Sequence, residues 1–181
     1  MSFCNDDIHY TLFEEKEIKE KVSELGRILT EEYRDKRPIA VCILKGSTVF
    51  FADLCRQMDC DLQMDFIVAS SYGAGTESSG HVNIKKDLDN DIKGRHVLLV
   101  EDIIDSGNTL YCLKHALLER NPASVKIVTL LDKSERRTSP IEADFCGFSI
   151  PNEFVVGYGL DYNERYRNLP YIGVLKHEVY S

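Results

Sequence analysis

The sequence predicts an α/β protein whose central sheet is mostly parallel and flanked by helices. Short apolar segments alternate along the chain with segments of helical periodicity, which is the pattern of parallel strands covered by helices. The chain has 181 residues, of which 43% are hydrophobic and 29% charged. This length and composition suit one globular domain over residues 1–181. We find no internal repeat and no linker-like stretch that would divide it.

The first half of the chain predicts two helices and two strands. Apolar residues between Ile18 and Leu29 recur at spacings of three, four and seven, which predicts a helix over residues 14–33. Residues 39–44 are apolar throughout, so we expect a short strand that is buried on both faces. Two further elements are expected, a helix over residues 48–58 and a strand over residues 64–70.

The second half begins with a segment rich in Gly and Ser over residues 71–80. It has few apolar side chains to pack it, so we expect a mobile loop. The remaining expected elements are an antiparallel strand over 81–86, a strand over 96–100, a helix over 109–119 and strands over 125–131, 154–158 and 171–175. Because ligands bind beyond the carboxyl ends of parallel strands, the residues that follow each strand are the candidates for function.

Charge and hydropathy exclude several classes of protein. The net charge of −8 opposes nucleic-acid binding, which needs a basic surface. No apolar run reaches the roughly 18–20 residues of a membrane helix, and residues 1–9 are polar and acidic, unlike a signal peptide. The cysteines are scattered without a C-x-x-C pair, so we expect neither a zinc site nor a disulfide framework. These features predict a cytoplasmic protein with no membrane or nucleic-acid partner.

The strongest functional signal is the segment over residues 97–110. An apolar strand is followed there by three acids, Glu101, Asp102 and Asp105. Such a cluster repels itself unless it meets a cation or takes part in chemistry. Glu101 and Asp102 offer acceptor pairs that suit a ribose diol, and Asp105 is placed to accept a proton near a reacting base.

The same segment predicts a phosphate-binding turn. Gly107 permits a tight turn that aims amides inward, and the following helix adds its positive N-terminal end. Ser106 and Thr109 add hydroxyl donors. The alternative is an ordinary strand–turn–helix in which Ser, Asp and Asn serve only as turn and cap residues.

This segment resembles the phosphoribosyl pyrophosphate-binding motif of the type I phosphoribosyltransferases. From about Ile8 to Leu175 the chain is similar to one branch of that family, the hypoxanthine(-guanine) phosphoribosyltransferases. The resemblance implies the type I phosphoribosyltransferase fold, with a small hood built from about residues 1–13 and 150–181.

The resemblance also assigns roles within the acidic segment. It implies that Asp105 is the general acid or base near purine N7. It implies that Glu101 and Asp102 bind the ribose hydroxyls, partly through magnesium (Mg2+). The residues implied to hold the 5′-phosphate are Asp105, Ser106, Gly107, Asn108 and Thr109.

A second set of residues is implied to bind pyrophosphate. Lys45 and Gly46 follow the first predicted strand and resemble the family's pyrophosphate loop, in which the peptide bond before the Lys is cis. The alternative is an ordinary turn with a solvated Lys. Arg167 resembles the arginine that contacts pyrophosphate, a task suited to its rigid fork of donors. Ser71 and Tyr72 resemble the start of the family's flexible loop, against the alternative of a plain hairpin tip.

A third set is implied to bind the purine. Lys133 resembles the lysine that donates to the exocyclic O6, a contact that would select 6-oxopurines over adenine. Phe154 would stack on the purine, Val155 would offer backbone groups to its edge, and Asp161 would contribute to the base and metal sites. A surface Lys133 and a core Phe154 are the alternatives. The implied metal ligands are Glu101, Asp102 and Asp161.

The resemblance as a whole implies Mg2+-dependent transfer of the 5-phosphoribosyl group from phosphoribosyl pyrophosphate to N9 of hypoxanthine or guanine. The products would be IMP or GMP and pyrophosphate, and the enzyme would be a homodimer or homotetramer. Three alternatives stay open: an enzyme that prefers xanthine, one that prefers adenine, and a non-catalytic regulator that senses phosphoribosyl pyrophosphate. The acidic charge and the presence of Lys133, Phe154 and Asp161 disfavour the regulator.

Overall fold

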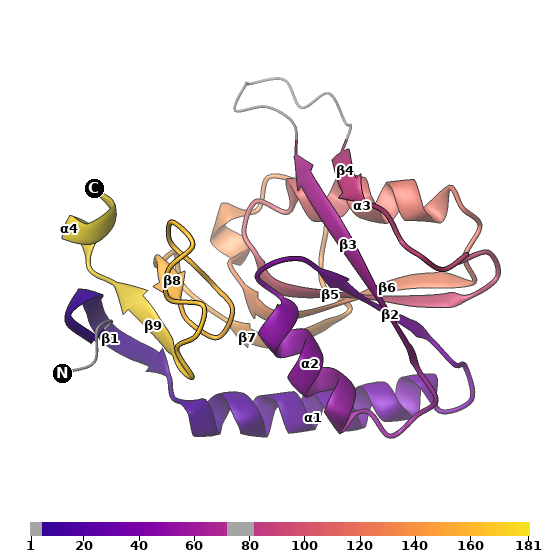
Figure 1. Ribbon diagram of the computed structural model, residues 1–181, viewed down its shortest axis with the longest axis horizontal. Helices are drawn as coiled ribbons and strands as arrows, with labels where there is room; N and C mark the ends of the chain where they lie inside the picture. The colour runs from indigo at the N-terminus through magenta and orange to yellow at the C-terminus, as the bar shows by residue number, and fades with distance from the viewer. Residues whose placement is uncertain (1–4, 72–81) are drawn as a thin grey trace.

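The computed structural model describes residues 5–71 and 82–181. Its main sheet has six strands in the order β4-β3-β2-β5-β6-β7 (Figure 1). All neighbours in it are parallel except β4, the antiparallel edge strand. The mostly parallel sheet and its antiparallel return strand, both predicted from the sequence, are confirmed. The strands are β2 (Ile39–Ile43), β3 (Gln63–Ser71), β4 (Val82–Lys86), β5 (His96–Ile104), β6 (Ser124–Asp132) and β7 (Phe145–Ser149).

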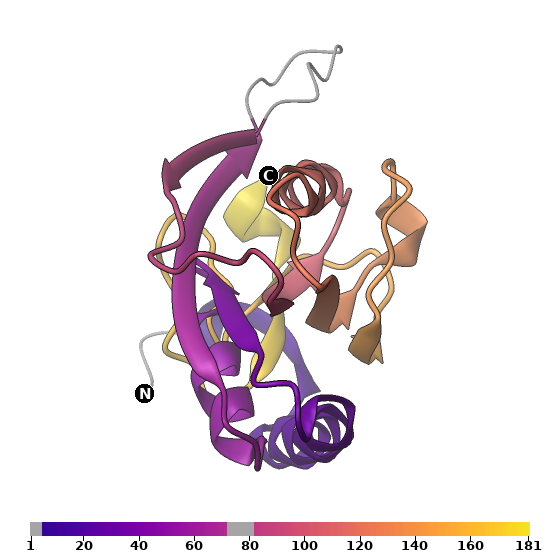
Figure 2. The same cartoon turned by 90° about the vertical axis from the view of Figure 1, so that its right-hand side faces the viewer.

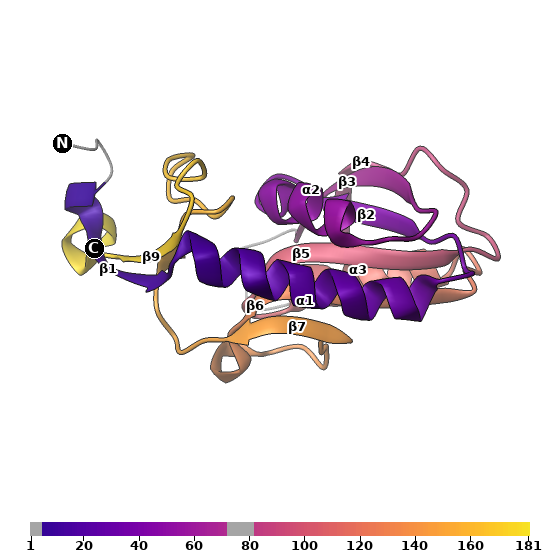
Figure 3. The same cartoon turned by 90° about the horizontal axis from the view of Figure 1, so that it is seen from below.

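Helices cover both faces of this sheet (Figures 2 and 3). In β2, Ala40 and Cys42 join one apolar cluster, while Ile39 and Ile43 join the other. This strand is therefore buried on both faces, as its unbroken apolar sequence predicts. The first cluster contains residues of α1 (Glu15–Tyr33) and α2 (Thr48–Gln57), and the second contains residues of α3 (Asn108–Leu118).

A second, antiparallel sheet lies at one end of the main sheet, at the left of Figure 1. Its order is β1-β9-β8, so it joins segments from both ends of the chain. Its strands fall within the terminal segments from which the resemblance builds the small hood. Its strands are β1 (Ile8–Phe13), β8 (Val155–Val156) and β9 (Ile172–Leu175), flanked by a 3-10 helix (Asn5–Asp7) and by α4 (His177–Tyr180).

Two strands, β5 and β8, differ from the expected bounds by more than one residue at an end, and two others, β1 and β7, were not among the expected strands. β5 continues to Ile104 rather than to residue 100, because its pairing with β6 extends as far as Ile104 and Asp132. The strand expected over residues 154–158 is limited to two residues, because Gly157 and Tyr158 have φ values of 99° and 50°. These values lie outside the β region.

Residues 72–81 lie outside the described residues, and with them Tyr72 and most of the loop expected over residues 71–80. Ser71 is the last residue described before that gap, at the end of β3. No helix in the described part of the chain is long and apolar enough to cross a membrane. The five cysteines described there are free thiols.

Asp65, in β3, holds the segment that connects β4 to β5. Its residue is 1% exposed, and its oxygens accept hydrogen bonds from the amides of Phe66, Asp89 and Asn90 at 2.7–3.2 Å. Asn90 Nδ2 adds a further bond at 2.8 Å. Burial alone would raise the pKa of Asp65, but these hydrogen bonds outweigh it and hold the pKa below its ordinary value.

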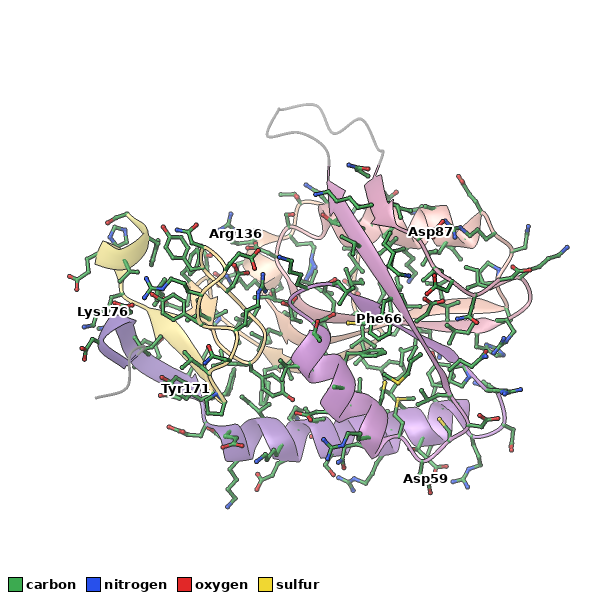
Figure 4. The ribbon with its side chains drawn as sticks, viewed as in Figure 1. Asp59, Phe66, Asp87, Arg136, Tyr171 and Lys176 are labelled. Atoms are coloured by element: carbon green, nitrogen blue, oxygen red, sulfur yellow. The ribbon has the colours of Figure 1, made fainter. Side chains whose placement is uncertain are left out.

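We expect Asp65→Asn to lower the free energy of unfolding by about 2–3 kcal/mol at pH 7, since hydrogen bonds to a charged group contribute about 1.5–3 kcal/mol. Because the pKa of Asp65 is lower in the folded state, its stabilisation is complete above the unfolded-state pKa of about 3.9 and is lost as the pH falls through the folded-state pKa. Urea unfolding at pH 7 and pH 3 measures this, and the gap between wild type and variant should narrow at pH 3. The exposed Asp59, at the lower edge of Figure 4, gives the control Asp59→Asn. Equal midpoints for wild type and Asp65→Asn at pH 7 would contradict the expectation.

Candidate active site

Two adjacent cavities open at the carboxyl ends of the main-sheet strands. The first, the β5–α3 cavity, has a volume of about 260 Å³ and is lined by the turn after β2 and by most of the segment from Glu101 to Leu110. The second, the Phe154 cavity, has a volume of about 490 Å³. The two cavities share Ile103 and Asp105. Of the predicted site residues with described side chains, all but Arg167 line one of them.

The turn between β5 and α3 is built around Gly107, whose φ is 81°. A Cβ at this position would lie 2.4 Å from Ile141 Cγ2, so the turn needs both a left-handed backbone and the absence of a side chain. The first amides of α3 have no acceptor within the helix. Residues 106–110 line the β5–α3 cavity, which therefore borders the positive end of the helix.

Asn108 lies at this turn, but its side-chain oxygen is engaged elsewhere. It accepts hydrogen bonds from Thr138 Oγ1, at 3.1 Å, and from Ser139 Oγ. The carbonyl of Ser106 also accepts bonds from the amides of Thr138 and Ser139, at 3.0 and 3.2 Å. The segment at 138–139 thus holds the turn in place. Sequence reasoning missed it, because it carries no motif and lies 30 residues further along the chain.

Glu101, which is half-buried, and Asp102, which is buried, form an acid pair near the end of β5. Asp102 is 8% exposed and accepts a hydrogen bond from the amide of Ile103 at 2.8 Å. Burial, followed by the neighbouring carboxyl of Asp102, raises the pKa of Glu101 well above its ordinary value, and burial also raises the pKa of Asp102. Neither acid forms an ion pair with a lysine or arginine among the residues described. The acids near this site that do form such pairs are Asp105 and Asp161.

The turn after β2 packs directly on this acid pair. The peptide bond between Leu44 and Lys45 is cis, as the resemblance implied. A Cβ added to Gly46 would lie 1.8 Å from Asp102 Oδ2. On its other side the turn meets Gly159, where an added Cβ would lie 2.1 Å from the carbonyl oxygen of Gly46. Both glycines are therefore required by close approach.

Asp105 lies at the boundary of the two cavities, between two basic side chains. Lys133 Nζ is 3.9 Å from Asp105 Oδ2, and Arg136 Nε is 3.1 Å from Asp105 Oδ1. Lys133 is only 7% exposed, so the alternative of a surface lysine is wrong. Burial lowers the pKa of Lys133, and the charge of Asp105 opposes that effect.

Arg136 was not among the predicted site residues, although it lines the Phe154 cavity. Figure 4 shows it between the C-terminal segments and the main sheet. It ends the 3-10 helix Ser134–Arg136, which directly follows Lys133. Lys133 directly follows the end of β6, and this nearness to a strand end is the sequence signal that could have identified Arg136.

Phe154 lies among aromatic side chains from the C-terminal part of the chain. Its ring stacks on that of Tyr180, with centroids 4.6 Å apart and planes at 21°, and meets Tyr162 edge-on at 5.6 Å. Tyr180 also lines the cavity. Sequence reasoning did not find Tyr180, because a single aromatic residue outside any periodic segment gives no signal.

Arg167 does not line either cavity, but it links residues around them. Its Nη1 donates to the carbonyl of Gly159 at 2.8 Å, and its Nη2 lies 2.9 Å from Asp161 Oδ1 and 3.4 Å from Glu164 Oε2. Lys45 Nζ lies 3.0 Å from Glu164 Oε1. Lys45 and Arg167, the two cations predicted to bind pyrophosphate, therefore meet at Glu164.

No group of three or more His, Cys, Asp or Glu side chains in residues 5–71 and 82–181 gathers closely enough to hold a metal ion. Glu101, Asp102 and Asp161 thus do not form a metal site that is closed by protein ligands alone. Any ion held by the acid pair would take further ligands from water or from a bound substrate.

The model of the phosphoribosyl transferase domain matches residues 10–163. The chain belongs to the phosphoribosyltransferase family. It is 60% identical to the hypoxanthine-guanine phosphoribosyltransferase of Streptococcus pneumoniae over an alignment of 176 residues. This alignment covers 97% of this chain and 98% of that protein. The residues that match the family model include every strand of the main sheet and both turns that border the β5–α3 cavity.

Solved structures of phosphoribosyltransferases are similar over nearly the whole chain. A hypoxanthine phosphoribosyltransferase from Staphylococcus aureus superposes with a TM-score of 0.96 and 50% identity, covering 99% of this chain and 98% of that one. A mutant hypoxanthine phosphoribosyltransferase from Trypanosoma cruzi, in a ternary substrates complex, superposes with a TM-score of 0.92 and 43% identity, covering 97% and 100%.

Proposed function

We propose that this phosphoribosyltransferase acts in purine salvage on hypoxanthine and guanine. It transfers the 5-phosphoribosyl group from phosphoribosyl pyrophosphate to N9 of the base, giving IMP or GMP and pyrophosphate. The observation that carries the proposal is the pair of cavities that share Asp105. One offers a phosphate-binding turn and the other a buried lysine and an aromatic ring. The similarity to hypoxanthine-guanine phosphoribosyltransferases supports the same choice of base.

In this proposal the β5–α3 turn binds the 5′-phosphate. The amides from Asp105 to Thr109 and the hydroxyls of Ser106 and Thr109 donate to its oxygens, and the helix end adds positive potential. Asn108 contributes through its backbone, since its side chain is bonded to Thr138 and Ser139.

The acid pair fits the ribose hydroxyls and a Mg2+ ion. A half-buried and a buried carboxyl that form no ion pair with a lysine or arginine in the described chain favour a bound cation. Mg2+ suits them, because it commonly binds one or two carboxylates and completes its shell with water and substrate oxygens. When bound, the ion neutralises charge on the leaving pyrophosphate. Glu101 and Asp102 would hold it, with Asp161 contributing from the base site.

The Phe154 cavity takes the purine. Phe154 stacks on the ring, Val155 presents backbone groups to its edge, and Lys133 donates to O6. Asp105 lies 3.9 Å from Lys133. Because N7 of the purine adjoins O6, a base held by Lys133 would place its imidazole part where Asp105 exchanges a proton with it. Lys45, the amide of Gly46 and Arg167 hold the pyrophosphate as it leaves.

The direct test is turnover of phosphoribosyl pyrophosphate and Mg2+ with hypoxanthine, guanine, xanthine and adenine in parallel. We expect IMP and GMP to form far faster than the products of the other two bases. Faster turnover of xanthine or adenine than of hypoxanthine and guanine would contradict the proposed base specificity. Tight binding to RNA or DNA without turnover of any base would favour the regulator instead. A homodimer or homotetramer, and a cytoplasmic location, stay predictions; sedimentation velocity tests the first.

Lys133→Met tests the selection of 6-oxopurines. We expect kcat/KM for hypoxanthine to fall by about 10–100-fold, since a hydrogen bond from a charged group contributes about 1.5–3 kcal/mol. The KM for phosphoribosyl pyrophosphate should change little, because Lys133 lines only the Phe154 cavity. Steady-state kinetics measures both, with Lys93→Met at an exposed position as the control. An unchanged kcat/KM would remove Lys133 from the purine site.

A further inference from the structure

Glu164 lies between the two cations assigned to pyrophosphate, and each of its oxygens contacts one of them. Oε1 is 3.0 Å from Lys45 Nζ, and Oε2 is 3.4 Å from Arg167 Nη2. Lys45 comes from the turn after β2, 119 residues away in the chain. The carboxylate of Glu164 thus contacts the same side-chain donors, Lys45 Nζ and Arg167 Nη2, that a phosphate group would contact.

The backbone around Glu164 is built to place it there. Asn163 and Glu164 have φ values of 50° and 61°, a left-handed conformation that residues other than Gly seldom adopt. The amide of Glu164 donates to Asp161 Oδ2 at 2.9 Å, and Arg165 donates back to the carbonyl of Tyr162 at 3.0 Å.

Stability does not explain this arrangement. The side chains of Lys45 and Glu164 are 68% and 64% exposed, and exposed ion pairs contribute little to the free energy of folding. The left-handed turn therefore gains little stability from the ion pair between Lys45 and Glu164, and its placement of Glu164 on Lys45 and Arg167 points to a role in binding.

Charge balance at this place indicates what that role is. Arg167 Nη2 also lies 2.9 Å from Asp161 Oδ1, so two carboxylates face two cations. Without ligand, the positive charge of Lys45 and Arg167 is already neutralised.

We propose that Glu164 sets the affinity of the pyrophosphate site. Its carboxylate occupies Lys45 and Arg167 when the site is empty, and pyrophosphate must displace it to bind. Glu164 consequently lowers the affinity of the site for pyrophosphate. Its carboxylate contacts Lys45 and Arg167 again when pyrophosphate departs. The inference rests on the proposed function, since it takes pyrophosphate as the ligand of these two cations.

Glu164→Gln tests the proposal, because it removes the charge and keeps the length of the side chain. We expect inorganic pyrophosphate, with magnesium chloride, to bind about 3–10-fold more tightly, because the variant removes one negative charge that competes with a multiply charged anion in screened solvent. Isothermal titration calorimetry gives the Kd, and product inhibition by pyrophosphate gives an independent value. The gain should shrink at high salt, and the KM for hypoxanthine should stay unchanged.

Two control variants isolate the effect. Glu119→Gln removes the same charge from an exposed position at the end of α3 and should leave the Kd of pyrophosphate unchanged. Glu164→Asp keeps the charge and should not tighten binding. A structural role for Glu164 predicts the opposite result for Glu164→Gln, since loosened cations would bind pyrophosphate more weakly.

The outcomes separate this inference from the proposed function. If wild type binds pyrophosphate and forms IMP, but Glu164→Gln binds pyrophosphate equally or more weakly, the inference is overturned and the function stands. If wild type neither binds pyrophosphate nor turns over any purine, the proposed function fails and the inference fails with it. Tighter binding in Glu164→Gln alone, among the three variants, supports the proposal.

Discussion

Asp105→Asn should lower kcat by about 10²–10⁴-fold, the usual contribution of a positioned general acid or base. Asparagine keeps the volume of the side chain at the boundary of the two cavities, but it cannot take up the purine proton. Binding of IMP and GMP should survive, because the phosphate-binding turn and the Phe154 cavity keep their other residues. Single-turnover kinetics measures the chemical step, and fluorescence or calorimetric titration with IMP measures binding.

The matched control for this variant is Asp61→Asn. Asp61 is an acid on the surface, with a side chain that is 74% exposed, and its loss should change neither kcat nor IMP binding. A kcat for Asp105→Asn close to that of wild type would refute proton transfer by Asp105. A parallel loss of turnover and IMP binding would instead assign Asp105 to ligand binding.

Gly159→Ala should damage both stability and pyrophosphate binding. Gly159 has a φ of 101°, and the new Cβ would lie 2.1 Å from the carbonyl oxygen of Gly46. We expect the free energy of unfolding to fall by about 2–5 kcal/mol, the sum of a strained backbone and an overpacked contact. Because the turn after β2 must shift, the KM for phosphoribosyl pyrophosphate should rise by about tenfold or more.

Gly94→Ala separates these two causes. Gly94 also has a left-handed backbone, with a φ of 68°, but an added Cβ there would meet nothing within 4 Å. This variant should show only the cost of backbone strain in a urea titration, with normal kinetics. If Gly159→Ala matched Gly94→Ala in stability and in KM, the contact between Gly159 and Gly46 would be unimportant.

The main sheet was predictable because its strands and helices differ in local pattern. Strands buried on both faces carry unbroken apolar runs, as residues 39–44 show, and α1 carries the 3.6-residue period of a helix packed on one side. β7 was not predicted, for a physical reason. It lies at the edge and contains Gly147, where an added Cβ would lie 2.6 Å from the carbonyl oxygen of Leu130. The close approach that requires glycine also weakens the strand pattern.

The pairing of the second sheet could not be derived from local pattern, although strands over residues 154–158 and 171–175 were predicted. β8 has only two residues, and β1 pairs with β9 from the opposite end of the chain. Only the resemblance to a family placed these segments together.

The candidate site divides in the same way. Residues that directly follow strands, such as Asp105 and Lys133, were predictable because parallel strands bring their carboxyl ends to one edge of the sheet. Glu164 and Tyr180 were not, because their significance comes from Lys45 and Phe154, which are distant in sequence. Arg136 lies between these cases, next to a strand-end residue but without a motif of its own.

The position of β9 in the middle of the second sheet has a consequence for synthesis on the ribosome. The register pairs Phe13 with Ile172, so the earlier of these two segments must wait for one that is synthesised much later. Contacts of such wide sequence separation form late. The β5–α3 turn needs no residue beyond β7 for its sheet pairing. A nascent chain can therefore form the β5–α3 turn well before translation supplies the strand that completes the second sheet.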